Sequence, residues 1–309
     1  MTELPANPVP LGVPTTDAHT HLGTTERKSG LTAADAVARA GEAGVHRLVD
    51  VGYDVPSSVA AVAAAEEHPE VVAAVAIHPT DAAQLGDGLD EALRGIEALL
   101  GTSERIRGVG ETGLDFHWIE DADGRARQRD AFAAHIGWAK AHDLALVIHD
   151  RDAHAEILDV LAAEGWPDRV QMHCFSGDAD HARACLAHGA WLSFPGTVTF
   201  KANEALREAA RITPRDRILA ETDAPYLTPV PVRGRPNASY LLPHTVRFLA
   251  DLRDEDVDDL AGVLDANATA LFGDWGRDAF PGGRSPRILG DLPPGNAHGD
   301  ATRPGGDHG

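Results

Sequence analysis

Two histidines separated by one residue, His19 and His21, end the first apolar segment of the sequence. In an extended strand, residues two apart point to the same face, so both imidazoles project to one side. Neutral imidazole is the commonest metal ligand, and two of them at one strand end can share a cation. The chain has 16 histidines, so this pair alone is weak evidence for a metal site. Asp17 lies two residues before His19 and would face the same side of the strand, deeper in the barrel. There it would orient a ligand or satisfy backbone groups.

Four further ionisable residues stand where apolar segments give way to loops. They are Glu111 in GVGETGLD, His149 in VIHDRDAH, His173 in MHCFSG and Asp223 in LAETDAPYL. Each of them alone is explained equally well by a buried salt bridge or a capped turn. Together with the histidine pair they make two carboxylates and four imidazoles, a set that is costly to bury without cations. A divalent metal centre is the simplest way to stabilise it.

The size of this set indicates two cations rather than one. A catalytic zinc usually takes three protein ligands and keeps one position open, so two sites that share a carboxylate need about six ligands. Glu111 lies in the chain between the two groups of histidines, and we expect it to be the shared carboxylate. Nitrogen and carboxylate oxygen suit Zn, Mn, Fe or Mg and do not choose among them. A bridged pair of cations can generate hydroxide at neutral pH.

Alternating strands and helices must position these residues. Apolar segments predict strands over 13–23, 46–52, 71–79, 105–113, 145–150, 169–177, 191–196 and 217–227. Helical segments are predicted over 31–45, 57–69, 90–101, 124–143, 154–165, 178–189, 202–212, 244–253 and 254–273. Thr32 is a plausible N-cap of the first helix and Gly44 its stop. This alternation predicts an α/β fold, a TIM (β/α)8 barrel whose strand ends form one catalytic rim, although an open doubly wound sheet has the same alternation.

The predicted domain organisation is simple. An N-terminal extension covers residues 1–14, and a single barrel domain covers 15–280. From 281 to 309 the sequence is too rich in Gly and Pro to pack, and a disordered tail is predicted.

Composition and charge narrow the class of protein. Hydrophobic residues at 43% and charged residues at 24% are ordinary globular values and exclude a disordered or coiled-coil chain. A net charge of −21 argues against a protein that coats nucleic acid through a basic face. It leaves room for an enzyme that handles a phosphodiester in a small pocket with metal ions.

The cysteines and the N-terminus predict a cytoplasmic protein. Cys174 and Cys185 cannot make a disulfide framework and fit a reducing compartment. Cys174 follows a ligand in the chain, so we expect its thiol to point away from the site, toward the helices. The start of the chain has no signal-peptide pattern, and no apolar run is long enough to span a bilayer. No membrane association and no obligate protein partner are predicted.

The motifs in order resemble one known family. His19-x-His21, GETGLDF, HDRDA, HCFSG, SFPGTVTFK and ETDAPYL with PVRGRPN are together similar to the TatD family of metal-dependent hydrolases. The resemblance covers nearly all of residues 15–273, and its motifs are jointly highly specific. It implies a TIM barrel of the amidohydrolase kind with a divalent metal site. The segment NASYLLPHTV is longer than the compact loop of many members, which puts substrate choice in doubt.

The same resemblance implies how the ligands divide. His19, His21 and Asp223 would hold one metal, His149 and His173 the other, and Glu111 both. Family members are similar to deoxyribonucleases, and 3′-to-5′ exonuclease activity on single-stranded DNA is ascribed to some of them.

From this resemblance we predict a deoxyribonuclease that cleaves phosphodiester bonds at DNA ends by metal-activated water. Glu111 and Asp223 are its predicted catalytic residues. Asp223 would orient the attacking water or take its proton, because it lies beside the metal. With a net charge of −21, engagement of a few terminal nucleotides is the expected mode of binding.

Four residues near the predicted rim are candidates for substrate contact. Arg151 follows His149 by two residues, and Arg233 and Arg235 lie in the loop after the eighth strand. Guanidinium groups suit phosphate, although solvated surface charge explains the loop pair equally well, and Arg151 would equally pair with an acidic neighbour. His78 ends the third predicted strand, where it would contact substrate or support a ligand.

Two alternatives remain open from the sequence. One is carbonyl hydrolysis on the same metal site, for example the ester of a D-aminoacyl-tRNA, an activity linked to other TatD members, or a cyclic amide. The other is a barrel without catalysis, whose metals are structural or whose role is binding. An open coordination position would argue against the second alternative.

Overall fold

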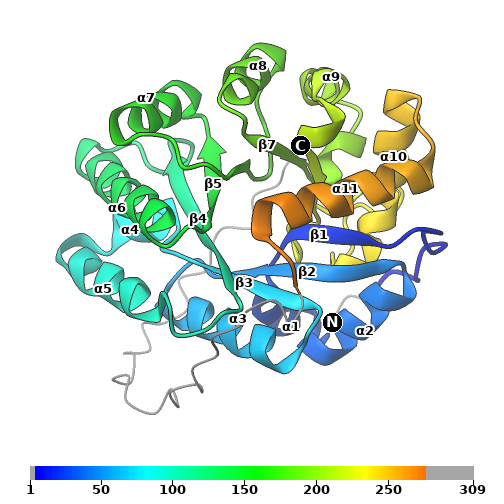
Figure 1. Ribbon diagram of the computed structural model, residues 1–309, viewed down its shortest axis with the longest axis horizontal. Helices are drawn as coiled ribbons and strands as arrows, with labels where there is room; N and C mark the ends of the chain where they lie inside the picture. Colours follow the sequence, from blue (N-terminus) through cyan, green and yellow to red (C-terminus); the bar gives the residue numbers. More distant parts are fainter. Residues whose placement is uncertain (1–3, 276–309) are drawn as a thin grey trace.

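The computed structural model describes residues 4–275 and shows eight parallel strands in one sheet (Figure 1). The strands are β1 Thr15–Thr20, β2 Val45–Val51, β3 Val71–Val75, β4 Ile106–Asp115, β5 Ala145–Arg151, β6 Val170–Met172, β7 Trp191–Phe194 and β8 Ile218–Ala220. They pair in chain order from β1 to β8, which confirms the TIM barrel and excludes the doubly wound sheet, whose strand order reverses.

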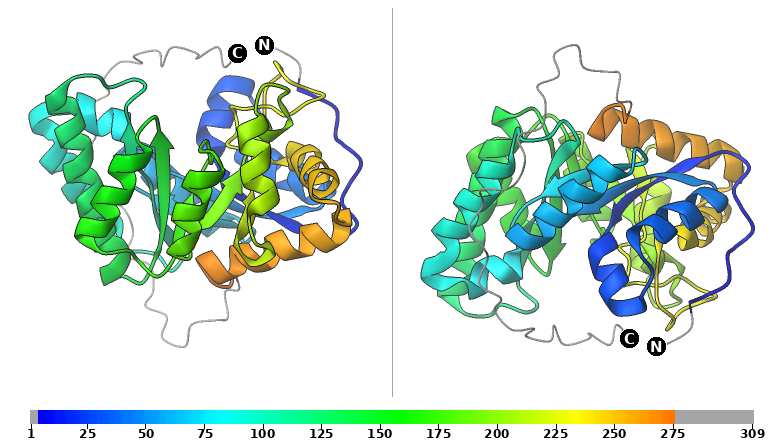
Figure 2. Two further views of the ribbon diagram at one scale, coloured as in Figure 1. Left: turned by 90° about the horizontal axis from the view of Figure 1, so that it is seen from above. Right: turned by 90° about the horizontal axis from the view of Figure 1, so that it is seen from below.

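Helices surround the strands, as the views from above and below show (Figure 2). They are α1 Leu22–Ser29, α2 Ala33–Glu42, α3 Val55–Glu67, α4 Pro79–Gln84, α5 Leu89–Leu99, α6 Ala122–Ala141, α7 His154–Glu164, α8 Ala179–Ala187, α9 Glu204–Ile212, α10 Leu242–Arg253 and α11 Val257–Phe272. Thr32 caps α2 as predicted, because its side chain accepts a hydrogen bond from the Asp35 N–H at 3.1 Å. Among the described helices, none combines the length and apolar character that a bilayer span requires.

Alternation along the strands separates two apolar layers. Leu48, Val71 and Ile148 belong to the large core shared with the helices. Val49 and Val147 belong to a second core with Leu271, Phe272 and Trp275 from the end of the described chain. The barrel interior is therefore filled with side chains, as a barrel of eight strands requires.

Four predicted strands end three or more residues earlier than expected, and the sixth of the eight ends at Met172 instead of 177. The first ends at Thr20, and His21 instead precedes α1. The third ends at Val75, since His78 is the N-cap of α4 and Pro79 occupies its first position. The eighth ends at Ala220, three residues before Asp223. Helices α1 and α4 were not predicted, because both are short and follow directly on an extended segment.

The N-terminal segment lies against the barrel from residue 4 onward. The Leu11 N–H donates to the carbonyl of Ala43, and the Tyr240 hydroxyl donates to the carbonyl of Pro5 at 2.7 Å. The predicted domain end at 280 and the predicted tail over 281–309 lie outside the described residues.

The seam between the last and first strands closes at residues beyond β8. The Asp223 N–H donates to the carbonyl of His19 at 2.9 Å, and the His21 N–H donates to the carbonyl of Ala224 at 2.9 Å. Below them, the carboxylate of Asp17 accepts from the N–H and the hydroxyl of Thr222 at 2.8 and 2.6 Å. Asp17 therefore fastens the seam, which agrees with its predicted role of satisfying backbone groups.

Candidate metal centre

The structure brings all six predicted ligands together at the carboxyl ends of the strands. His19 and His21 come from the end of β1, Glu111 from β4, His149 from β5, His173 from just after β6, and Asp223 from beyond β8. Between these side chains, the nitrogen and oxygen atoms that face one another lie 2.8–3.8 Å apart. We call this set the mouth cluster.

Glu111 points into the cluster because β4 is irregular where it pairs with β5. The pairing slips between Val109 and Thr112, and a bulge of this kind re-aims the side chains beyond it. Gly113 has a φ of +134°, and a Cβ there would overlap the carbonyl of His149. Only glycine lets the two strands approach so closely at this point.

One oxygen of Glu111 faces the first group of ligands. Its Oε2 lies 3.7 Å from Nε2 of both His19 and His21. The same two nitrogens lie 3.8 and 3.3 Å from Oδ1 of Asp223, and 3.3 Å from each other. These four side chains present their donor atoms to one common point.

The other oxygen of Glu111 faces the second group. Its Oε1 lies 2.8 Å from Nδ1 of His149, 3.2 Å from Nε2 of His173 and 3.3 Å from Nε2 of His78. The carboxylate thus has one oxygen toward each group, which is the arrangement that a bridging ligand needs.

His78 takes part through a proton rather than a lone pair. Its Nδ1 accepts the N–H of Thr80 at 3.1 Å, so a neutral ring carries its hydrogen on Nε2. That N–H is directed at Glu111 Oε1. His78 therefore lies at the cluster, and its hydrogen bonding suits a donor to a carboxylate or to a substrate oxygen better than a metal ligand.

Hydrogen bonds around the cluster fix which ring nitrogens are free. Nδ1 of His21 lies 2.7 Å from the carbonyl of Val51, and Nδ1 of His173 lies 2.9 Å from Oε1 of Glu221. Both Nδ1 atoms must carry hydrogen, which leaves the Nε2 lone pairs aimed into the cluster. Nδ1 of His19 is buried without a hydrogen-bond partner. This donor set fits divalent cations of the zinc type, which imidazole and carboxylate ligands suit.

Buried charge inside the cluster shifts its pKa values. Burial raises the pKa of Glu111, but the neighbouring His78 and His173 and the hydrogen bond from His149 outweigh it and hold that pKa well below its usual range. Burial opposes protonation of His149, yet hydrogen bonds to Asp115 and Glu111 raise its pKa to about 9. The carboxylates and imidazoles thus compensate one another's charge, and a bound cation would compete with protons for the same ring nitrogens.

His19 behaves differently from its neighbours. Burial, assisted by the nearby charge of His173, lowers the pKa of His19 to about 3. Its ring stacks on that of His173 with centroids 3.6 Å apart. The imidazole of His19 is therefore neutral at physiological pH, the form in which it binds a cation.

Sequence reasoning missed Glu221, a carboxylate behind the cluster. Glu221 is fully buried. Besides His173, it accepts hydrogen bonds from the N–H of Cys174 at 2.7 Å, the hydroxyl of Ser193 at 2.5 Å and the amide of Gln171 at 3.2 Å. The signal was its place two residues before Asp223, in the same motif. Asp115 has a similar position behind His149, at 3.1 Å from its Nε2.

Cys174 lies beyond the end of β6, so the strand alternation behind its predicted orientation does not apply. Burial, together with the negative charges of Asp223, Glu221 and Glu111, raises the pKa of its thiol well above the usual range. Alternation fails because Cys174 has a φ of +45° and does not continue β6, which ends at Met172.

The candidate arginines lie at the end of β5 and in the loop that follows β8. Arg151 ends β5, and its guanidinium lies 5.6 Å from the ring centre of Trp118, which is 44% exposed. Asp152, the acidic residue next to it in the chain, contacts His117 at 3.2 Å. Arg233 lies over the ring of Phe200. Arg233 and Arg235 are both exposed.

Helix α1 adds basic residues that the sequence analysis did not consider. Lys28 lies over the ring of Tyr226, 3.9 Å from its centre, and Arg27 donates to the hydroxyl of Tyr53 at 2.6 Å. Both tyrosine rings approach His21, with centroid distances of 5.8 Å for Tyr53 and 6.4 Å for Tyr226. Two cationic side chains therefore stand next to the first group of ligands.

Comparison with known proteins agrees with this geometry. The family model described as TatD related DNase matches residues 16–273. An uncharacterized metal-dependent hydrolase, TatD, from Mycobacterium tuberculosis is 45% identical over 260 residues, which cover 83% of this chain and 97% of that protein. The 3′-5′ ssDNA/RNA exonuclease TatD of Escherichia coli is 33% identical over 247 residues, which cover 77% of this chain and 92% of that protein.

A solved structure supports the same assignment. The YJJV protein of Escherichia coli, a TatD homolog, superposes with a TM-score of 0.74 at 26% identity, covering 84% of this chain and 98% of that one. Family model, sequence relatives and fold agree over the barrel that carries the mouth cluster. The chain therefore belongs to the TatD family of metal-dependent hydrolases.

Proposed function

We propose that this hydrolase cleaves phosphodiester bonds at the ends of single-stranded nucleic acid, most readily DNA, with 3′-to-5′ polarity and two divalent cations in the mouth cluster. The observation that carries the proposal is the orientation of the Glu111 carboxylate. One of its oxygens faces His19 and His21, and the other faces His149 and His173. The Escherichia coli relative that bears an activity in its name is a 3′-5′ ssDNA/RNA exonuclease.

In this proposal His19, His21 and Asp223 hold one cation, His149 and His173 the other, and Glu111 both. Bound there, the cations would lower the pKa of water and neutralise charge on the phosphoryl oxygens. Asp223 is 14% exposed at its side chain and is thus reachable from solvent, unlike fully buried His19. Its carboxylate orients the attacking water and accepts its proton.

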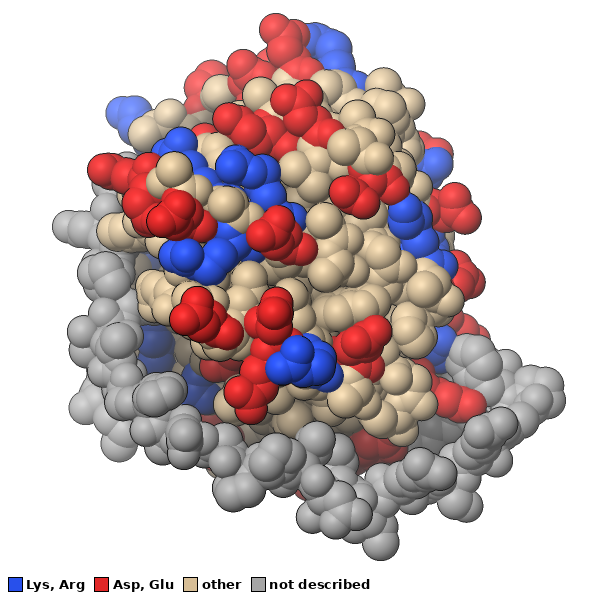
Figure 3. Space-filling view, turned by 90° about the vertical axis from the view of Figure 1, so that its left-hand side faces the viewer, with Lys and Arg blue, Asp and Glu red and all other residues tan. Residues whose placement is uncertain are grey.

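The surroundings of the cluster suit the end of a strand better than a long duplex. Lys28, Arg27 and Arg151 supply local positive charge, which favours phosphate. On the side of the barrel shown in Figure 3, acidic and basic side chains are interspersed. With a net charge of −21, affinity for extended nucleic acid is weak, and a few terminal nucleotides provide the binding energy.

Arg233, Arg235 and His78 are proposed to assist in holding the substrate. The His78 N–H that faces Glu111 can donate equally to a phosphoryl oxygen that approaches the second group. The relatives described above do not support the D-aminoacyl-tRNA deacylase alternative.

The test is a hydrolysis panel with the metal-reconstituted chain. Single-stranded DNA, duplex DNA, RNA and a D-aminoacyl-tRNA are compared at equal concentration, with His19→Ala as the variant that loses a ligand. We expect stepwise release of nucleotides from the 3′ end of single-stranded DNA, and intact DNA beside a hydrolysed D-aminoacyl-tRNA would contradict the proposal.

Asp223→Asn tests the role of the carboxylate. We expect kcat on single-stranded DNA to fall by about 10²–10⁴-fold, the usual contribution of general acid–base catalysis. The matched control is Asp90→Asn on the exposed surface of α5, which should keep wild-type kcat. Wild-type kcat in Asp223→Asn would remove Asp223 from the mechanism.

A further inference from the structure

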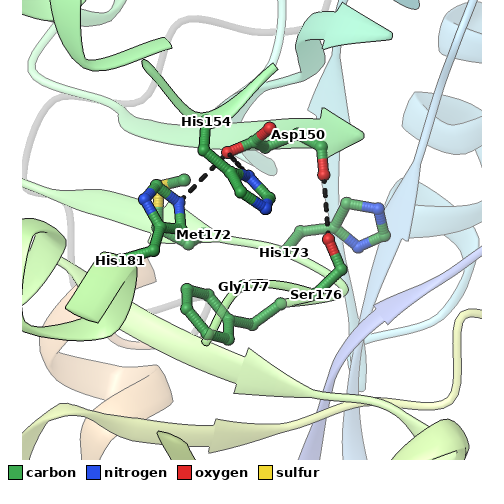
Figure 4. Close-up of a pocket in the computed structure, with 8 residues that line it drawn as sticks. Asp150, His154, Met172, His173, Ser176, Gly177 and His181 are labelled. Atoms are coloured by element: carbon green, nitrogen blue, oxygen red, sulfur yellow. Dashed lines mark hydrogen bonds and ion pairs between the residues drawn. The ribbon is translucent and has the colours of Figure 1, made fainter. Parts of the chain in front are cut away.

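A second cluster of metal-binding side chains lies behind the mouth cluster, between β5, α7 and α8. It consists of Asp150 at the end of β5, His154 at the first position of α7 and His181 on α8, and Figure 4 shows all three around one small pocket. We call it the Asp150 cluster. Oδ2 of Asp150 lies 2.8 Å from Nδ1 of His154 and 3.1 Å from Nε2 of His181.

The cluster is buried more deeply than an ordinary surface ion pair. The side chain of Asp150 is 6% exposed and that of His181 is 7% exposed, whereas that of His154 is 37% exposed. The other carboxylate oxygen of Asp150, Oδ1, is buried and has no hydrogen-bond partner. A buried carboxylate that leaves one oxygen unsatisfied retains capacity for another ligand, because such an atom is costly to leave alone.

The donor atoms have the spacing of a metal site. All three lie within 4.8 Å of one another. Ligands on a tetrahedral zinc, with bonds of about 2.0–2.1 Å, are about 3.3 Å apart. The observed 2.8 and 3.1 Å are slightly shorter, as expected where hydrogen atoms rather than a cation lie between the groups. Small side-chain shifts would admit the ion.

We propose that Asp150, His154 and His181 form an additional binding site for a zinc-type divalent cation, distinct from the mouth cluster. Two imidazoles and one carboxylate favour zinc, cobalt or nickel over magnesium, which prefers oxygen ligands. His173 also lines the pocket, but both of its ring nitrogens are directed at Glu111 and Glu221. It therefore belongs to the mouth cluster.

The position of the site gives it a structural role. Asp150 is the residue after His149, and its carbonyl accepts the hydroxyl of Ser176 from the loop that follows His173. A cation on Asp150, His154 and His181 would fasten the end of β5 to α7 and α8. It would thus hold the backbone next to both ligands of the second group.

Cys185 is a neighbour of this site and not one of its ligands. Its sulfur lies 3.6 Å from Nε2 of His181, one helical turn along α8. The donor atoms that lie together here are those of Asp150, His154 and His181, without this thiol.

The test is a zinc count on the full chain. After removal of metal, wild type is dialysed against buffered zinc, and bound zinc per chain is measured by mass spectrometry. The His154→Gln/His181→Gln double variant should bind one equivalent less than wild type. His188→Gln removes an exposed histidine at the end of α8 and should bind as many equivalents as wild type.

Circular dichroism checks that the double variant is folded: its spectrum must match that of wild type. His154→Gln alone, at a partly exposed helix start, provides a second variant that should also lose the equivalent. Equal zinc counts in wild type and both folded variants would overturn the proposal.

The number of zinc ions bound per chain can be tested independently of the proposed nuclease activity. Glu111→Gln disrupts the mouth cluster, and the difference of one equivalent between chains with and without His154 and His181 should persist in that background. Loss of the proposed nuclease function would therefore leave this result unchanged.

Discussion

The two ends of the barrel bury charge in different ways. At the carboxyl ends of the strands, Glu111 faces other ionisable side chains. At the opposite end, Arg105 is 7% exposed and donates to backbone carbonyls, those of Ala65, Pro69, Val71 and Trp275. These four partners are peptide groups, which carry no net charge and do not exchange protons.

This difference distinguishes a buried charge that stabilises the fold from buried charges that can bind a ligand. A cation surrounded by backbone carbonyls fixes one conformation and offers nothing to a ligand. Carboxylates and imidazoles that face one another depend on protons that a cation or a substrate can replace. A buried charge therefore indicates a functional site when its partners are themselves ionisable.

Arg105→Met should give the largest effect on stability. It leaves several buried carbonyls without donors, and we expect the free energy of unfolding to fall by about 3–4 kcal/mol. Urea unfolding of the metal-free chain measures it. The control Arg183→Met removes an exposed arginine and should change stability by less than about 0.5 kcal/mol. If Arg105 is purely architectural, kcat per folded molecule stays at the wild-type value.

His135 extends the comparison, because it is a fully buried histidine near Glu111 whose hydrogen-bond partners within residues 4–275 are all uncharged. Its Nε2 accepts the N–H of Ile77, and its Nδ1 contacts the hydroxyl of Thr112. Burial lowers the pKa of His135 from 6.5 to about 4. The unfolded chain therefore binds this proton first, so the contribution to stability is complete above pH 6.5 and is lost as the pH falls toward 4.

We expect wild type to lose about 3 kcal/mol more than His135→Gln between pH 7 and pH 4. Urea unfolding of both proteins at the two pH values gives the difference. Identical pH dependence in the two proteins would mean that His135 is not held neutral by burial.

Glu221→Gln should give the smallest effect of the three. The substitution keeps the shape but removes the charge that holds Nδ1–H of His173, and loss of such a partner lowers metal affinity or activity about 10–100-fold. Metal titration and kcat on single-stranded DNA measure it. Ser193→Ala removes a donor to the oxygen of Glu221 that faces away from His173, and should have less effect. A wild-type metal affinity in Glu221→Gln would mean that Glu221, like Arg105, only stabilises the fold.

Residue types and chain order predicted the barrel and the six residues at its mouth. Each of His19, Glu111 and His149 follows an apolar segment, and parallel strands bring such segment ends to one rim. The sequence could not predict the irregularity in β4 that turns Glu111 inward, because a bulge depends on pairing with β5.

Partners from distant segments were equally hidden. Glu221 binds His173 across 48 residues; its place in the Asp223 motif marks it as a candidate, but the sequence does not show which residue it contacts. Helix α1 was missed because its eight residues give too short a periodic pattern, and Lys28 was missed with it. The alternation used to orient Cys174 was extended beyond the end of β6, where it no longer applies.

The hydrogen bonds that join Asp223 to His19 and His21 to Ala224 have a consequence for biosynthesis. The first group of ligands combines residues from the first strand and from the segment after the last strand of the barrel. More than two hundred residues must therefore be synthesised before this group can form. A nascent chain without Asp223 lacks the first group of ligands. The metal centre can be completed only after the segment that follows β8 has been synthesised.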